Sequence, residues 1–218
     1  MVLIENNKMK RPPYTDADFV EFCKRAEADE KLRKQKQQEI DKKRKERSDK
    51  IKATHAQHDK LVELGAKWLM KNPPTKGNCH CTKCSIATTE IVTFASENPD
   101  VLGFANDAKS VLLEAKISRE DFKRDFKKDF RINPERGMGD FRLYIAPKGL
   151  IKIEELPENW GLIEVDEKDK CKIVKFAEKQ PSNKRGEMMV LTSLIKRIGQ
   201  NAPEGVSIKC YSYETKNK

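Results

Sequence analysis

The first quarter of the chain has almost no hydrophobic positions at helical spacing. Residues 15–52 are dominated by Lys, Arg, Glu, Asp and Gln, and no Pro or Gly residue interrupts them. Thr15 followed by Asp18 is typical of a helix N-terminus, where a side-chain oxygen and an acidic first turn are favourable. The pattern therefore predicts a long exposed helix. Because such a helix is polar on every side, core packing cannot stabilise it.

From His58 the pattern changes, and an amphipathic helix is predicted up to the break at Asn72-Pro73-Pro74. Its apolar residues are Leu61, Val62, Leu64, Ala66, Trp68, Leu69 and Met70. Residues 86–94 are rich in Thr, Ile and Val, which favours a strand. The later segments predict a hairpin over 100–117, a helix over 118–130, strands over 141–146, 161–165 and 172–176, and a helix over 187–198.

These elements predict an α/β protein with three regions. A charged, largely helical arm occupies 1–54, an α/β core occupies 55–180, and a C-terminal helix with a tail occupies 181–218. The arm is the most basic region, because Lys31–Lys52 holds eleven Lys or Arg against four Asp or Glu, a local net charge of +7. Two interpretations of the arm remain open. It is a solvated charged helix, or it contacts nucleic acid, a second copy or another protein.

The overall composition narrows the class of partner. The 218 residues carry a net charge of +10, with a pI near 9.2, which suits a polyanion such as DNA. No apolar run approaches the roughly 18 residues of a membrane span, so we expect no membrane partner. Residues 1–11 lack the apolar core of a secretion signal, and the cysteines do not form a spaced disulfide framework. We therefore expect a cytoplasmic protein.

Candidate chemistry lies in the predicted hairpin. Glu114 and Lys116 are two residues apart on one strand, so their side chains point to the same face. Asp100, at the start of the partner strand, can join them at the sheet edge. Two carboxylates beside one ammonium group suit metal-assisted phosphodiester hydrolysis, because carboxylates bind hard divalent cations. The alternative is a hairpin with ordinary surface charges, or a salt bridge inside the sheet.

The residue pattern of this region resembles that of the PD-(D/E)XK nuclease superfamily. Pro99-Asp100, a spacing of thirteen residues and Glu114-Ala115-Lys116 correspond to the family pattern. The segments that follow are similar to small nuclease-like proteins of phages, prophages and bacterial DNA-repair loci. These segments are Ser118–Phe122, Arg136–Gly139 and Tyr144–Ile151. The resemblance covers roughly residues 60–175 and does not include the arm.

The resemblance implies a restriction-endonuclease-like core with the elements in the order helix, three strands, helix, strand. It also implies that the protein acts within a bacterial host cell. It implies Mg or Mn bound by Asp100 and Glu114, with Lys116 positioning or deprotonating the attacking water. One further carboxylate is expected, and Glu63 and Glu90 both remain candidates. The implied activity is a metal-dependent endo- or exodeoxyribonuclease of DNA processing or repair. The alternative is a catalytically inactive factor on the same fold that binds nucleic acid or protein.

A cysteine cluster and a basic helix face complete the candidate sites. The cluster Cys79, His80, Cys81 and Cys84 has spacings that suit a structural zinc ion, or it is a loop with unligated thiols. A zinc-stapled structural protein with a coiled-coil arm is a further interpretation, but the arm lacks an apolar heptad seam. The basic positions expected to contact DNA phosphates, or to form a solvated face, are Lys123, Arg124, Lys127, Lys128, Arg131 and Arg136.

Overall fold

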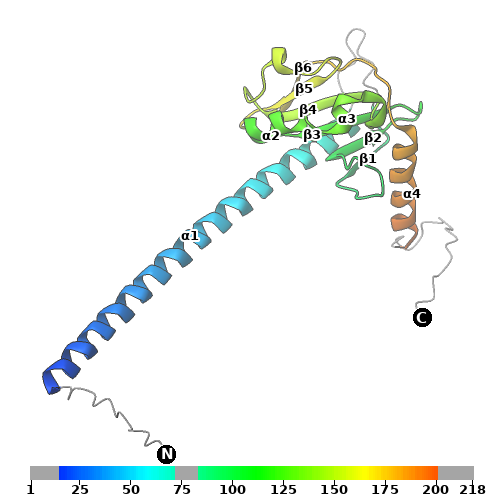
Figure 1. The fold of residues 1–218 in the computed structure, drawn as a ribbon. Coiled ribbons are helices and arrows are strands. Elements are labelled where there is room, and N and C mark those ends of the chain that lie inside the picture. Colours follow the sequence, from blue (N-terminus) through cyan, green and yellow to red (C-terminus); the bar gives the residue numbers. More distant parts are fainter. Residues whose placement is uncertain (1–14, 72–82, 201–218) are drawn as a thin grey trace, which may run out of the picture. The chain divides into compact units, whose positions relative to one another are not determined.

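One continuous helix, α1 (Asp16–Met70), replaces the two helices that the pattern suggests (Figure 1). Residues 53–57 contain no Pro or Gly, so nothing in the sequence interrupts the helix between its polar and amphipathic parts. The computed structural model describes residues 15–71 and 83–200. The chain forms two compact units, Met1–Ala53 and Thr54–Lys218, and α1 contributes to both. The predicted long charged helix is therefore confirmed.

In the described part of the second unit, six strands form one mixed sheet in the order β1-β2-β3-β4-β5-β6. The strands are β1 (Ile86–Thr89), β2 (Val101–Phe104), β3 (Ser110–Ala115), β4 (Phe141–Pro147), β5 (Gly161–Val165) and β6 (Cys171–Lys175). The first three pair antiparallel, β3, β4 and β5 run parallel, and β6 returns antiparallel. The predicted α/β class is confirmed, with helix α1 first, then three strands, helix α2 (Arg119–Asp125) and strand β4.

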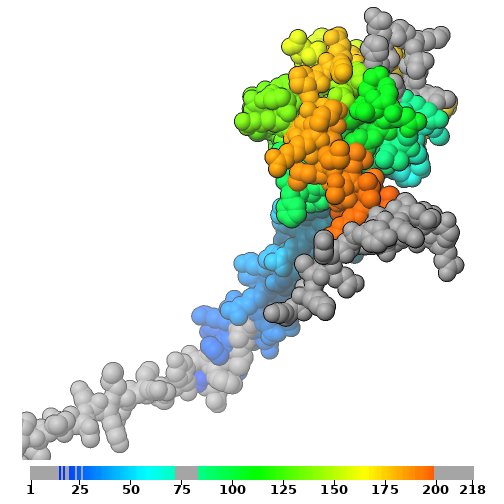
Figure 2. All heavy atoms as spheres, turned by 90° about the vertical axis from the view of Figure 1, so that its right-hand side faces the viewer, coloured from blue at the N-terminus to red at the C-terminus, as the bar shows by residue number. Residues whose placement is uncertain are grey.

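Helices cover both faces of the sheet. Leu61, Val62 and Leu69 of α1 pack on one face against the odd-numbered residues of β3, such as Leu113. On the other face, Phe122 of α2 joins a second core with Leu112, Met138, Tyr144, Trp160 and Val190. Val190 belongs to α4 (Lys184–Gln200), which is drawn in orange in Figure 2. Helix α4 also buries Glu187 and packs Leu194 against this core, whereas Met188, Ile195 and Ile198 are exposed. Because strand side chains alternate, even-numbered β3 residues face α2.

Two predicted elements are shorter than the sequence suggests. The strand predicted over 86–94 ends at Thr89, because Glu90 adopts a left-handed backbone with φ of 48° that turns the chain away. The helix predicted over 118–130 ends at Asp125 and restarts as α3 (Asp129–Ile132), followed by a 3₁₀ turn at Pro134–Arg136. None of the described helices is both long and apolar enough to cross a membrane.

Candidate functional site

The paired ends of β2 and β3 bring together the three residues of the predicted metal site. Val101 pairs with Leu113, so one further step along the register sets Asp100 opposite Glu114. The Oδ2 atom of Asp100 accepts a hydrogen bond of 2.8 Å from the backbone N–H of Ala115. The predicted juxtaposition of Asp100, Glu114 and Lys116 is therefore present in the fold.

Lys116 is buried among carboxylates. Its Nζ atom donates to Oε2 of Glu114 at 3.2 Å and to Oδ1 of Asp125 at 3.4 Å, and lies 3.9 Å from Oδ2 of Asp121. Burial alone would lower the pKa of Lys116, but these negative charges hold the pKa above its ordinary value. The ammonium group therefore stays protonated at neutral pH, and it acts here as a positive charge with fixed donors.

Arg131 belongs to this site, and its predicted role as a surface contact for DNA is wrong. The side chain was expected to contact DNA phosphate, but it is only 2% exposed. Its Nε atom donates to Oδ2 of Asp125 at 2.8 Å, and its Nη1 atom pairs with Glu97. Its Nη2 atom lies 2.9 Å from Oε1 of Glu114, yet it has no aligned hydrogen-bond acceptor among the described residues. Arg131 is excluded from a phosphate contact because buried carboxylates surround it.

Asp125 joins these groups into one network that the sequence did not reveal. Its Oδ2 atom also accepts a hydrogen bond of 2.8 Å from the hydroxyl of Tyr144, and its Oδ1 atom lies 2.7 Å from Nζ of Lys128. Burial would raise the pKa of Asp125, but the charges of Arg131 and Lys116 hold it well below its usual range. The available signal was weak: Asp125 lies three residues after Phe122 on a helix of mixed charge, where it shares the buried face of Phe122.

Charged side chains of both signs gather around Glu114. Among the described residues, five carboxylates lie in this network, and five basic side chains contact them. The carboxylates are Asp100, Glu114, Asp125, Glu97 and Asp121, and the basic side chains are Lys116, Arg131, Lys128, Arg124 and His58. Burial raises the pKa of Glu114 to about 7, because Asp100 and Asp125 add to the effect and Arg131 and Lys116 only partly oppose it. A proton or a cation at Glu114 would therefore relieve the repulsion from Asp100 and Asp125.

His58 reaches the same edge from α1. Its Nε2 atom lies 3.5 Å from Oδ2 of Asp100, and its Nδ1 atom lies 3.7 Å from Asp59 and 3.9 Å from Glu90. The hydrogen bond to Asp100 is the main reason that the pKa of His58 is raised. Donor atoms of His58, Asp59 and Glu90 all lie within 4.8 Å of one another, a spacing that can hold a metal ion. The sequence placed His58 at the start of an amphipathic helix and did not link it to Asp100.

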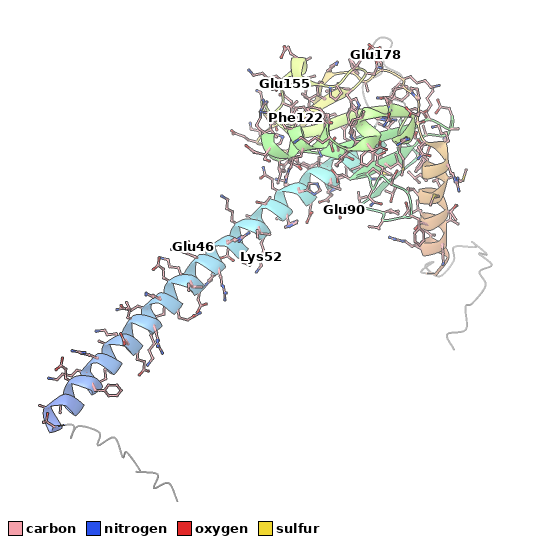
Figure 3. All side chains as sticks on the ribbon, in the orientation of Figure 1. Glu46, Lys52, Glu90, Phe122, Glu155 and Glu178 are labelled. Atoms are coloured by element: carbon pink, nitrogen blue, oxygen red, sulfur yellow. The ribbon has the colours of Figure 1, made fainter. Side chains whose placement is uncertain are left out.

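The two further carboxylates proposed from the sequence differ in their surroundings. Glu90, labelled in Figure 3, contacts His58, and its backbone N–H donates to the carbonyl of Asp100 at 3.1 Å. Glu63 is 65% exposed and pairs with Lys67, one helical turn later. Both line a shallow depression between α1 and β1. Of the two, Glu90 is the carboxylate that contacts the Asp100 edge.

The predicted zinc cluster falls mostly outside the described residues. Cys79, His80 and Cys81 lie between the two described ranges, 15–71 and 83–200. Cys84 is buried, and its backbone N–H donates to the carbonyl of Leu69 at 3.0 Å. Burial raises the pKa of the Cys84 thiol to about 12. Zinc binding by this cluster stays a prediction.

The remaining basic positions are exposed around α2 and α3. These are Lys123, Arg124, Lys127, Lys128 and Arg136. Arg124 lies 3.6 Å from Asp121, and Arg136 pairs with Asp129 at 2.8 Å, so part of their charge is balanced locally. Lys128 borders the buried network, because its side chain is 43% exposed and its Nζ atom lies 3.9 Å from Glu114. Lys128 is therefore a basic group that contacts both solvent and the site.

Comparison with known proteins finds a similar solved structure, but the function of that protein is unknown. No family model matches the chain. No curated protein matches it either. A solved structure that it resembles is the SPO1766 protein of unknown function from Silicibacter pomeroyi, with 25% sequence identity and a TM-score of 0.42. The match covers 56% of this chain and 84% of that chain.

Proposed function

We propose that this protein is a metal-dependent nuclease that hydrolyses DNA phosphodiester bonds on a restriction-endonuclease-like core. The observation that carries the proposal is the meeting of two carboxylates, Asp100 and Glu114, with the Lys116 ammonium group at the paired ends of β2 and β3. Burial and the charge of Asp100 raise the pKa of Glu114, and a divalent cation would stabilise two carboxylates that repel each other in this way. The observed order of α1, three strands, α2 and β4 agrees with the order that the resemblance implies.

Asp100 and Glu114 would hold Mg or Mn, and His58 or Glu90 would complete the site from the Asp100 side. When bound, such an ion polarises the phosphate and lowers the pKa of a coordinated water. Lys116 is already protonated, so its role is to orient the water or to stabilise charge on the phosphate. Asp125 holds the Lys116 ammonium in position through its 3.4 Å contact.

The present partners of Glu114 are compatible with metal binding. Its Oε1 atom faces Nη2 of Arg131, and that contact lacks an aligned hydrogen bond among the described residues. A cation at Oε1 would replace the ion pair with Arg131 without breaking an aligned hydrogen bond there. Arg131 would keep Asp125 and Glu97 as partners.

A second candidate is an inactive nucleic-acid-binding accessory factor on the same fold. The observation that favours it is the burial of the Glu114 and Lys116 side chains, which are 3% and 5% exposed. In that case the buried network would stabilise the fold, and the basic arm with its +7 charge would bind the polyanion. The two functions differ in whether Lys116 and a divalent ion are required.

The test is cleavage of linear and circular DNA, single- and double-stranded, with Mg or Mn and in excess EDTA. We expect metal-dependent cleavage that is lost in Lys116→Ala and Asp100→Asn. Glu63→Gln is the matched control, because Glu63 is exposed and contacts Lys67. Cleavage that persists undiminished in EDTA contradicts the nuclease proposal. DNA binding without cleavage, unaffected by Lys116→Ala, supports the accessory factor.

A further inference from the structure

Phe94 is a fully exposed aromatic side chain in the loop that leads to Asp100. Its relative exposure is 101%, and Val92 in the same loop is 68% exposed. Figure 1 shows this loop standing away from the sheet between β1 and β2. Exposing a whole phenyl ring to water is unfavourable, and aromatic rings are among the side chains most often used for recognition.

The loop is held in place and is not a free excursion of the chain. The backbone N–H of Glu90 donates to the carbonyl of Asp100 at 3.1 Å, which closes the loop at its base. Within it, the backbone N–H of Thr93 donates to Asn98 at 3.3 Å, and that of Ala95 donates to Thr93 at 3.1 Å. Ile91 is buried, so Phe94 projects from an anchored support.

The same loop is bound to the site that carries the proposed chemistry. Glu97 is buried, pairs with Arg131 and accepts a hydrogen bond from the backbone N–H of Met138. Arg131 in turn contacts Glu114. Phe94 is six residues from Asp100, which an extended chain spans in at most about 20 Å. That reach is comparable to a few nucleotides of single-stranded DNA.

The site to which the loop is connected indicates the chemistry of its ligand. Arg131 pairs with Glu97 of the loop and contacts Glu114, and the partly exposed Lys128 lies 3.9 Å from Glu114. An apolar ring on a loop connected to the proposed site of phosphodiester hydrolysis matches a ligand with flat apolar faces and an anionic backbone. Single-stranded nucleic acid has both features, whereas a duplex keeps its base faces stacked.

We propose that Phe94 is a stacking platform for an unpaired nucleobase, which makes single-stranded DNA, or a frayed DNA end, the preferred substrate. The placement of the phosphodiester at Asp100 and Glu114 rests on the proposed nuclease function. The stacking contact itself does not require catalysis. Stacking is therefore measured in EDTA, where cleavage cannot occur by the proposed mechanism.

The experiment compares binding of a short single-stranded oligonucleotide with binding of a blunt duplex of the same sequence. Phe94→Ala is expected to weaken single-strand binding by about 5- to 100-fold and to leave duplex binding unchanged, as removal of one stacked base implies. Val92→Ala is the matched control from the same loop and should bind like the wild type. In Phe94→Trp, the added indole fluorescence should change with the single strand and not with the duplex.

Equal binding by Phe94→Ala and the wild type, or an equal loss for single strand and duplex, overturns the proposal. Loss of a dimer in Phe94→Ala, measured by sedimentation, also overturns it, because a second copy would then be the occupant. Stacking results as expected, together with no metal-dependent cleavage by the wild type, would retain this inference and reject the nuclease proposal. The two failures are therefore distinguishable.

Discussion

Arg131 on α3 and Glu114 on β3 approach each other within 2.9 Å, although both side chains are almost completely buried. Burying either charge without a partner would lower the free energy of unfolding, and the attraction between the two side chains offsets part of that loss. Glu97 and Asp125 supply further negative charge to the same guanidinium group. Helix α2 ends at Asp125, and Arg131 reaches the same site from the separate helix α3.

Metal affinity should depend on pH through Glu114. The pKa of Glu114 is raised to about 7, so the carboxyl is mostly protonated below that pH and cannot act as a ligand. Affinity for Mn²⁺ should therefore rise as pH increases from 6 through about 7, and level off above about 8. Calorimetric titrations in two buffers with different ionisation enthalpies should also reveal proton release. Affinity that is constant over this range, or unchanged in Glu114→Gln, would contradict the assignment.

Removing Asp125 should destabilise the fold strongly. Asp125 is the shared partner of Arg131, Lys116 and Lys128, so Asp125→Asn removes a buried negative charge that contacts all three cations. Breaking a buried pair in this way costs roughly 3–5 kcal/mol in the free energy of unfolding. Urea denaturation measures this loss. Asp121→Asn is the control, with an expected cost below about 1 kcal/mol, because Asp121 is 35% exposed and lies 3.9 Å from Lys116.

The arm should contribute affinity for polyanions that depends on salt. A chain that lacks residues 1–53 should remain folded, because the α1 residues that pack in the core begin at Leu61. For each phosphate that the arm neutralises, its deletion should make the plot of log affinity against log salt shallower by about 0.7 for single-stranded DNA. Fluorescence anisotropy over a series of salt concentrations measures the slope. A slope that survives the deletion would assign the arm to another role, such as dimer formation.

Zinc binding by the cysteine cluster is tested by metal content. If Cys79, Cys81 and Cys84 ligate zinc, protein purified without added metal should contain about one zinc ion per chain by elemental analysis. Cys81→Ser should then release the metal and lower the melting temperature, because structural zinc contributes folding free energy. Cys171→Ser, in strand β6, should retain the zinc. Less than stoichiometric zinc, with the Cys79 and Cys81 thiols reactive in the native protein, would favour an unligated loop; Cys84 is buried and is not expected to react in either case.

The local pattern was sufficient for much of the fold. Short apolar stretches predicted the hairpin and the strands at 141–146 and 161–165, close to their observed bounds. The two-residue period of side chains along a strand placed Glu114 and Lys116 on one face, and the hairpin register brought Asp100 beside them. Such relations depend on neighbours in sequence or on one short turn, so they can be worked out without tertiary contacts.

The sequence by itself therefore determined the basic arm, the α/β order of elements and the meeting of Asp100, Glu114 and Lys116. Tertiary structure decided which charged residues are drawn inward. Arg131 belongs to a basic stretch that resembles a solvated surface, and its burial depends on Glu97 and Glu114 from other elements. His58 meets Asp100 only because α1 crosses the sheet at that edge. Long-range electrostatic pairing leaves no periodic signal in the chain, so the surroundings of the site could only be known from the fold.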